Sequence, residues 1–299
     1  MISFINWDVS TEIIEGWKTP NWYGLLFVSG MIIGYFVIQR MFKKEHIDEK
    51  YLDKLVLFMV VGTIVGARLG HVFFYGPYWD TFDEAGNIVD KGYFSHPIEM
   101  IKIWEGGLAS HGAAVVLLIT LFYFSRKVIN KSYLWMLDRI AAPIAVAGGF
   151  IRLGNLMNHE IVGDPTTLPW GFKFLYNDCN PTLIGNSMVY DCPWDTIPAR
   201  HPAQLYEAIC YFIAFGILMY LFWKKDAWKR QGIVFGTFLI LIFGARFMVE
   251  FVKLGLTERD AYLPINTGQI LSIPLVIAGA IILWKGLKRS PEESGKPIS

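Results

Sequence analysis

The chain has 299 residues, of which 54% are hydrophobic and only 18% are charged, whereas soluble domains carry roughly 25% charged residues. This deficit of charge, together with a mean hydropathy of +0.38, indicates a protein solvated by lipid and excludes an intrinsically disordered chain. The formal net charge of +1 excludes a nucleic-acid-binding domain built on a basic patch, and three cysteines are too few for a disulfide-stapled secreted scaffold.

Seven segments are long and apolar enough to cross a bilayer, which takes roughly 20 residues of helix. They cover residues 21–42, 55–75, 109–125, 134–155, 203–223, 232–252 and 267–284. We therefore expect an all-α polytopic membrane protein with seven transmembrane helices. Residues 94–108 predict an interfacial or re-entrant segment, and the polar insertion at 159–200 predicts a small extracytoplasmic head. The first 20 residues hold acidic side chains and no long apolar run, so we expect no cleavable signal peptide.

Basic residues concentrate in alternate connections, which fixes the expected orientation because such loops face the cytoplasm. These residues are Arg40, Lys43, Lys44, Lys50, Arg126, Lys127, Lys131, Lys224, Lys225, Lys229, Arg230, Lys285, Lys288, Arg289 and Lys296. The N-terminus is then outside and the C-terminus cytoplasmic. We expect a membrane domain over 1–158, the head over 159–200, and a membrane domain with a cytoplasmic tail over 201–299. Cys179 and Cys192 lie in the head, as either a disulfide or two free thiols.

Polar side chains inside the spans are costly, at roughly 2.5–3.5 kcal/mol for a charge on insertion scales, so each one needs a structural or functional reason. They lie at the C-terminal ends of the second, fourth and sixth spans and at the N-terminal ends of the others. Because successive spans run in opposite directions, all of them fall in the outward half of the membrane. We expect one polar cavity open toward the outer leaflet. The residues expected to line it are Arg68, His111, Arg152, Asn155, Gln204, Glu207, Arg246 and Glu250.

This pattern favours binding of an anion. Several arginines in one cavity need a negative partner, and at that depth the available one is a phospholipid phosphate, which guanidinium groups bind bidentately. His111 follows a glycine-rich stretch and opens a helix. The partial positive charge of a helix N-terminus disfavours a protonated imidazole, so we expect a neutral ring able to act as a general base.

Structural interpretations of the same residues stay open. Arg246 and Glu250 have the i,i+4 spacing of an ordinary helix ion pair. Arg68 and its neighbour His71 are equally consistent with a contact that ties helices together. Gln204 and Glu207 are more typical of helix–helix contacts than of catalysis.

Two other functions are alternatives. A transporter or flippase needs polar residues near the midplane that both sides can reach, whereas the inner halves of these spans are apolar. A retinal-type receptor needs an intramembrane lysine, and the seventh span has none before Lys285. A ligand-sensing receptor has no specific feature in its favour.

The motifs resemble those of the prolipoprotein diacylglyceryl transferase family nearly from end to end. The segment at 149–163, GFIRLGNLMNHEIVG, is similar to the family signature G-R-x-G-N-F-x-N-x-E. NWYG at 21–24, RHPAQLYE at 200–207, GARFMVEF at 244–251 and TGQILSIP at 267–274 also look like family blocks. The resemblance implies transfer of the diacylglyceryl group of phosphatidylglycerol to the lipobox cysteine of a prolipoprotein, with release of glycerol phosphate. It implies a bacterial inner-membrane enzyme; we expect no metal, no cofactor and no nucleic-acid partner.

The resemblance also carries residue roles onto matching positions. The matching residues are Tyr23, His111, Arg152, Asn155, Glu160, Gly163, Arg246 and Glu250. His111, Arg152 and Arg246 are the expected catalytic residues, and the others, with Arg68, Gln204 and Glu207, are expected to bind substrate. His111 would be the base for the thiol and the arginines would stabilise the leaving phosphate; alternatively, Arg246 activates the thiol and His111 orients the lipid. The chain departs from the family pattern at Ala113, His159 and Lys253.

Overall fold

The computed structural model describes residues 4–14, 16, 19–83, 86–103, 106–107, 109–184, 187–254 and 265–291. The chain folds as two compact units. Unit 1 comprises Met1–Arg40 and Leu137–Gly295, and unit 2 comprises Met41–Met136 and Lys296–Ser299.

Within the described residues, seven helical segments are long and apolar enough to span a membrane. They are Trp22–Lys44, Glu49–Phe74, His111–Val128, Tyr133–Met157, Ala203–Lys224, Ile233–Val252 and Thr267–Lys288. The seven predicted spans and the all-α membrane class are therefore confirmed. The second helix starts earlier than its apolar stretch, because the Asp48 Oδ1 atom accepts a hydrogen bond from the Lys50 backbone N–H at 3.0 Å and caps a charged first turn.

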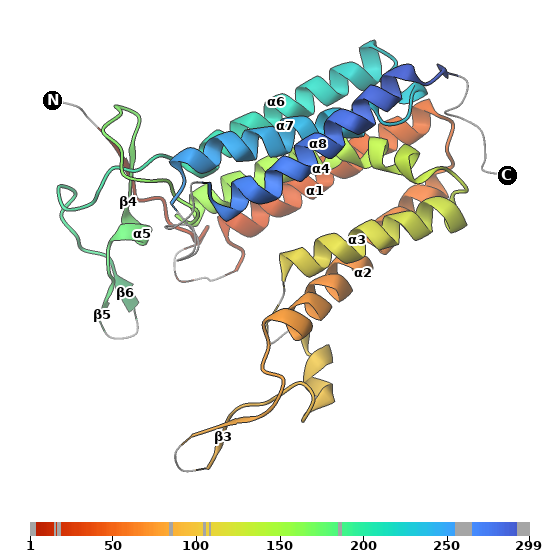
Figure 1. Ribbon diagram of the computed structural model, residues 1–299. Coiled ribbons are helices and arrows are strands. Elements are labelled where there is room, and N and C mark those ends of the chain that lie inside the picture. Colours follow the sequence, from red (N-terminus) through yellow and green to blue (C-terminus); the bar gives the residue numbers. More distant parts are fainter. Residues whose placement is uncertain are drawn as a thin grey trace. The chain divides into compact units, whose positions relative to one another are not determined.

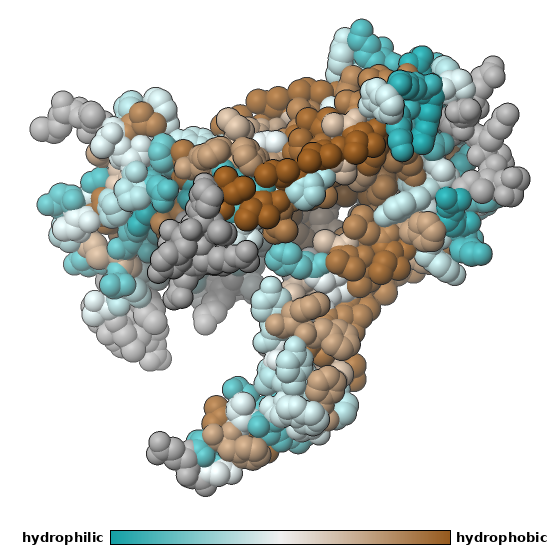
Figure 2. Space-filling view, viewed as in Figure 1, coloured by the Kyte–Doolittle hydropathy of each residue, from teal (hydrophilic) through white to brown (hydrophobic). Residues whose placement is uncertain are grey.

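Five long helices build unit 1 and lie side by side in Figure 1. They are α1 (Trp22–Lys44) and α4 (Tyr133–Met157), of which residues 41–44 and 133–136 fall in unit 2, and α6 (Ala203–Lys224), α7 (Ile233–Val249) and α8 (Thr267–Lys288). Small residues let α7 and α8 approach closely: a methyl group added at Gly236 would lie 2.8 Å from the Gly279 carbonyl oxygen. Figure 2 shows brown hydrophobic residues along these helices and teal hydrophilic residues gathered at their ends, as a membrane-spanning bundle requires.

The start of α7 is capped by a carboxylate from another helix. Asp138 in α4 is fully buried, and its two carboxylate oxygens accept hydrogen bonds from the Gly232 N–H at 2.7 Å and the Phe235 N–H at 2.8 Å. The neighbouring Arg139 is also buried and donates to the Trp228 carbonyl oxygen, which belongs to η4 (Ala227–Lys229). Asp138 therefore anchors the turn between α6 and α7 onto α4.

Replacing Asp138 with asparagine is expected to lower the free energy of unfolding by about 3 kcal/mol, because an amide group would face two N–H donors and the charge beside Arg139 would be lost. Asp226→Asn is the matched control: this carboxylate is about half exposed, and its pair with Lys229 is worth at most about 1 kcal/mol. Thermal unfolding of the detergent-solubilised protein measures both. Equal melting midpoints for the two variants would contradict this role of Asp138.

The polar insertion at 159–200 contains most of the strands of unit 1. The strand β1 (Ile5–Trp7), from the N-terminal segment, pairs in parallel with β4 (Phe172–Phe174). The short helix α5 (Leu175–Asp178) follows, and β5 (Thr182–Ile184) and β6 (Ser187–Val189) form an antiparallel hairpin. Cys179 and Cys192 form a disulfide with a Cα–Cα distance of 5.9 Å. Of the two alternatives, a disulfide or two free thiols, the structure therefore has the disulfide.

Unit 2 contains a helix pair and the long connection between its two helices. The helix α2 (Glu49–Phe74) packs along α3 (Ser110–Tyr123), which continues as the π-helical segment η3 (Phe124–Val128). Glycines at 62, 66 and 70 line the contact: a methyl group added at Gly70 would lie 2.6 Å from the Gly112 Cα. Between the helices, β2 (Thr81–Phe82) and β3 (Ile88–Asp90) form a hairpin, and the 3₁₀ helix η1 (Pro97–Ile101) lies in the segment predicted to be interfacial or re-entrant.

Candidate active site

An ion pair between α4 and α6 forms the centre of the polar site in unit 1. Arg152 lies in the last two turns of α4, and Glu207 lies one turn into α6. The Arg152 Nε atom is 2.7 Å from the Glu207 Oε2 atom, and the Glu207 side chain is fully buried. A buried carboxylate costs several kcal/mol unless a cation compensates it. This ion pair therefore holds α4 and α6 together at two of the residues expected to belong to the active site.

The signature segment continues this arrangement as a chain of hydrogen bonds. Arg152 Nη1 donates to Asn155 Oδ1 at 3.2 Å, and Asn155 Nδ2 donates to Glu160 Oε1 at 2.9 Å. Gln204, at the start of α6, donates from Nε2 to the Glu160 carbonyl oxygen at 3.0 Å. Asn155 and Gln204 are buried, whereas Glu160 is exposed. The chain fixes the plane of the Arg152 guanidinium group and ties the end of α4 to α6.

Tyr23 contacts the same end of α4 from α1. A methyl group added at Gly154 would lie 2.8 Å from the Tyr23 Cδ2 atom, so the ring packs directly on the glycine between Arg152 and Asn155. The phenol interacts electrostatically with Glu160 and Arg152. The structure therefore places Tyr23 beside the residues with which the family motif grouped it.

Lys253 connects the two buried glutamates. Its Nζ atom lies 3.5 Å from Glu207 Oε1 and 3.7 Å from Glu250 Oε2, and only 3% of its side chain is exposed. The expected i,i+4 pair between Arg246 and Glu250 is absent, although both residues are described. Glu250 begins the 3₁₀ helix η5 (Glu250–Val252), where residues three apart are stacked, so its partner is Lys253.

Arg246 in α7 is the least satisfied of the site's cations. Its Nε atom is buried and has no hydrogen-bond partner among the described residues, which costs roughly 1–3 kcal/mol. The buried phenol of Tyr211, one turn beyond Glu207, lies within electrostatic range of both Arg246 and Arg152. The unused Nε donor of Arg246 is suited to an anionic ligand.

Gly163 holds the three chain segments of the site together by its backbone. The Gly163 N–H donates to the His201 carbonyl oxygen at 2.9 Å, and the Asp164 N–H donates to the Val252 carbonyl oxygen at 2.9 Å. A methyl group added at Gly163 would lie 2.6 Å from His201 Cβ and even closer to the Val252 carbonyl oxygen. Only glycine allows the signature segment to lie against both the start of α6 and the residues that follow α7.

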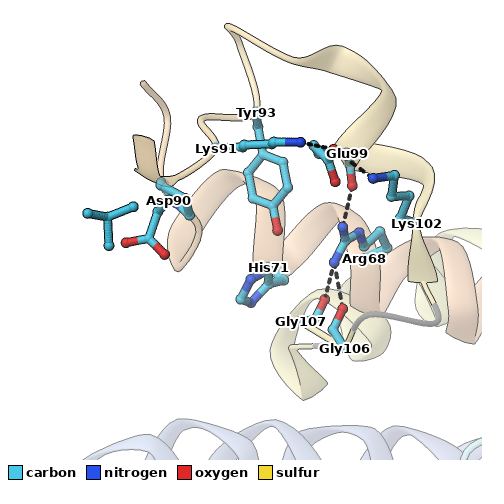
Figure 3. A pocket seen from close by; sticks show the side chains of 11 residues that line it. Arg68, His71, Asp90, Lys91, Tyr93, Glu99, Lys102, Gly106 and Gly107 are labelled. Carbon is cyan, nitrogen blue, oxygen red and sulfur yellow. Dashed lines mark hydrogen bonds and ion pairs between the residues drawn. The ribbon is translucent and has the colours of Figure 1, made fainter. Parts of the chain in front are cut away.

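His111 and Arg68, the remaining expected site residues, belong to unit 2. His111 is the second residue of α3 and is exposed, directly before the glycine that contacts α2. Arg68 lines a polar pocket of about 450 Å³ at the C-terminal end of α2, together with His71, Tyr93, Glu99 and other residues (Figure 3).

Sequence reasoning missed two contributors to the site. Tyr211 follows Glu207 by one helical turn, a spacing that could have found it. Gly268 packs against Glu250: a methyl group added there would lie 2.5 Å from the carboxyl carbon. No local pattern links Gly268 to Glu250, because the contact joins the start of α8 to the end of α7.

His159 is a buried histidine at the start of the polar insertion. Its ring is 2% exposed, lies 3.0 Å from the Val9 carbonyl oxygen through Nε2, and packs edge-on against Tyr176. Burial lowers the pKa of His159 below its ordinary 6.5, although the Val9 carbonyl and Asp8 oppose this. Its backbone is left-handed, with φ of 54°, which accounts for the glycine that the family pattern often has here.

Because the folded state disfavours protonation of His159, the unfolded state binds more protons below about pH 6.5. Acidification through that pH is therefore expected to destabilise the head, and above it this group has no effect. Hydrogen exchange in 159–200 at pH 5.5 and pH 7.5 measures the loss. His159→Asn, a residue that tolerates left-handed backbone, should flatten the dependence. An unchanged pH dependence in that variant would exclude His159 as its source.

The fold and the site define a polytopic integral membrane protein with a buried cation–carboxylate cluster at one end of its helices. The family model described as prolipoprotein diacylglyceryl transferase matches residues 13–285. The chain therefore belongs to the prolipoprotein diacylglyceryl transferase family and is a transferase.

Relatives with the printed name phosphatidylglycerol–prolipoprotein diacylglyceryl transferase match over nearly full length. The chain is 41% identical to the protein of Porphyromonas gingivalis over 293 residues, covering 96% of each chain. It is 39% identical to the protein of Chloroherpeton thalassium, covering 97% of each chain. It is also 39% identical to that of Tolumonas auensis, covering 94% of this chain and 97% of the relative.

Proposed function

We propose that the protein transfers the diacylglyceryl group of phosphatidylglycerol to the lipobox cysteine thiol of a prolipoprotein, the first step of bacterial lipoprotein maturation. The family membership supports the reaction. The observation that carries the site is the buried Nε atom of Arg246, which has no hydrogen-bond partner among the described residues. A phosphate oxygen from the lipid headgroup supplies the missing acceptor.

In this reaction the cysteine sulfur attacks the glyceryl carbon that carries the phosphate. A carbon–sulfur bond forms, the carbon–oxygen bond breaks, and the electron pair leaves with glycerol phosphate. Arg152 and Arg246 stabilise the negative charge that grows on this leaving group, which they do best in a low-dielectric site. Asn155 and Glu207 hold Arg152 in the required orientation.

The thiol must lose its proton, since its ordinary pKa is near 8.5 and the thiolate is the nucleophile. We assign His111 as the base that takes this proton. The alternative assigns thiol activation to Arg246 and leaves His111 to orient the lipid. The His111→Gln variant separates the two, because a lost base abolishes the rise of kcat with pH, whereas a lost orienting group mainly raises KM for phosphatidylglycerol.

The proposed location is the bacterial inner membrane, with the N-terminus outside, the C-terminus in the cytoplasm and the site open toward the outer leaflet. The basic residues of the connections support this orientation. The Cys179–Cys192 disulfide supports an extracytoplasmic head, because disulfides persist in oxidising compartments.

The test combines the purified protein with mass-labelled phosphatidylglycerol and a peptide that carries a lipobox cysteine. We expect a thioether-linked diacylglyceryl peptide and one glycerol phosphate for each transfer. A peptide with serine in place of the cysteine is the control and should stay unmodified. No labelled peptide with the wild-type protein would refute the proposed reaction.

A further inference from the structure

Arg68 binds backbone carbonyl groups. Its Nε atom donates to the Met100 carbonyl oxygen at 2.9 Å, and Nη1 donates to the carbonyl oxygens of Gly106 at 2.6 Å and Gly107 at 3.1 Å. Nη2 donates to the Glu99 carbonyl oxygen. Figure 3 shows the guanidinium group between Glu99 on one side and Gly106 and Gly107 on the other.

These contacts leave Arg68 little capacity for a lipid phosphate. A guanidinium group has five N–H donors, and four backbone oxygens accept from this one. The centre of the Tyr93 ring lies 5.2 Å from the guanidinium carbon of Arg68, and Arg68 is only 7% exposed. Arg246 in unit 1 differs, because its Nε atom has no acceptor among the described residues.

The two glycines that Arg68 binds precede His111 by only four and five residues in the chain. Gly107 has a φ of +72°, and a methyl group added there would lie 2.7 Å from Arg68 Nη1. The N–H of Ala109, the N-cap of α3, donates to the Ala67 carbonyl oxygen at 2.9 Å. On the far side of His111, the close contact of Gly112 with α2 fixes the first turn of α3.

We infer that Arg68 is a positioning residue: it holds the backbone of Glu99, Met100, Gly106 and Gly107 against α2 and thereby sets the start of α3, from which His111 projects. The catalytic part of this inference rests on the proposed function. A misplacement of about 1 Å at a reacting group can cost about 10²-fold in rate, so holding the backbone on both sides of one histidine has a measurable catalytic effect.

The kinetic test compares Arg68→Gln with wild type at saturating peptide. A positioning residue predicts a fall in kcat of about 10- to 100-fold with KM for phosphatidylglycerol within about 2-fold, because the lipid contacts are untouched. Arg68→Lys, which keeps the charge but not the planar fork, should behave in the same way. A raised KM with unchanged kcat would make Arg68 a headgroup ligand, and unchanged values of both would remove any role; either result overturns the inference.

A second variant tests the contact between Arg68 and Gly107 by changing the glycine instead of the arginine. Gly107→Ala places a methyl group 2.7 Å from Arg68 Nη1 and 2.6 Å from His71 Cδ2, so it displaces the Arg68 contact and is expected to reproduce the kcat defect. Gly86→Ala is the matched control, because Gly86 also has positive φ, +82°, but an added methyl group there meets nothing within 4 Å. Equal kinetics for these two variants would contradict the inference.

A measurement that does not need activity separates this inference from the proposed function. Hydrogen exchange of the full-length protein in detergent reports on the Ala109 amide and its neighbours. Arg68→Gln is expected to raise exchange at least 10-fold in peptides covering 99–109 and to leave α8 unchanged. Unchanged exchange at 99–109 would overturn the inference. Absent transfer by the wild-type protein would refute the proposed function and leave the exchange result to decide whether Arg68 holds this segment.

Discussion

Replacing Arg246 with lysine is expected to lower kcat for diacylglyceryl transfer by about 10²- to 10³-fold, the cost of removing one well-placed donor from a developing oxyanion. Lysine keeps the positive charge but loses the planar fork that binds two phosphate oxygens at once. The Arg246 Nε atom has no hydrogen-bond partner among the described residues, so the substitution removes little that holds the helices together. Single-turnover rates and thermal unfolding midpoints on the same preparation separate catalysis from stability.

Arg126→Lys is the matched control, since Arg126 is exposed in η3 and lies over the Phe122 ring. This variant should retain wild-type transfer. An Arg246→Lys protein that transfers within about 3-fold of wild type would show that two-point phosphate contact at this position is not needed.

Replacing Gly163 with alanine is expected to abolish most activity and to cost about 3 kcal/mol of stability. The added methyl group would meet His201 Cβ at 2.6 Å and the His201 carbonyl oxygen at 2.7 Å, as well as the Val252 carbonyl oxygen. Backbone atoms cannot move aside as a side-chain rotamer does. The segment must separate from α6 or from η5, which shifts Glu207 or Lys253 and with them the Arg152 guanidinium group. Transfer rate and unfolding midpoint measure the two effects.

The control for this substitution is Gly216→Ala in the interior of α6. A methyl group there meets nothing within 4 Å, and alanine favours helix over glycine by up to about 1 kcal/mol. The control should be neutral or slightly stabilising. If Gly163→Ala behaved as Gly216→Ala does, the close packing at Gly163 would not limit the site.

The sequence predicts the membrane helices well because their signal is local. An apolar run such as 267–284 must become a helix in lipid, where every backbone polar group needs an internal partner, and α8 covers Thr267–Lys288. The grouping of Arg152, Asn155 and Glu160 was also predictable, since these residues are close in the chain and within one motif.

The partners of individual charges were less predictable, because they depend on backbone geometry and on distant segments. The i,i+4 spacing suggested that Glu250 forms an ion pair with Arg246. The helix changes from α to 3₁₀ at Glu250, however, and Glu250 forms its ion pair with Lys253 instead. Arg68 is buried near the C-terminal end of α2, but its acceptors are carbonyl groups more than 30 residues further along the chain. The pairing of β1 with β4 is similarly distant.

The most direct test of the central claim is an experimental structure of the protein in a bilayer mimetic with phosphatidylglycerol bound. We expect the lipid phosphate to lie about 3 Å from nitrogen atoms of both Arg246 and Arg152, in the cluster that contains Glu207 and Lys253. A phosphate bound elsewhere, with these two guanidinium groups paired only to protein atoms, would contradict the account.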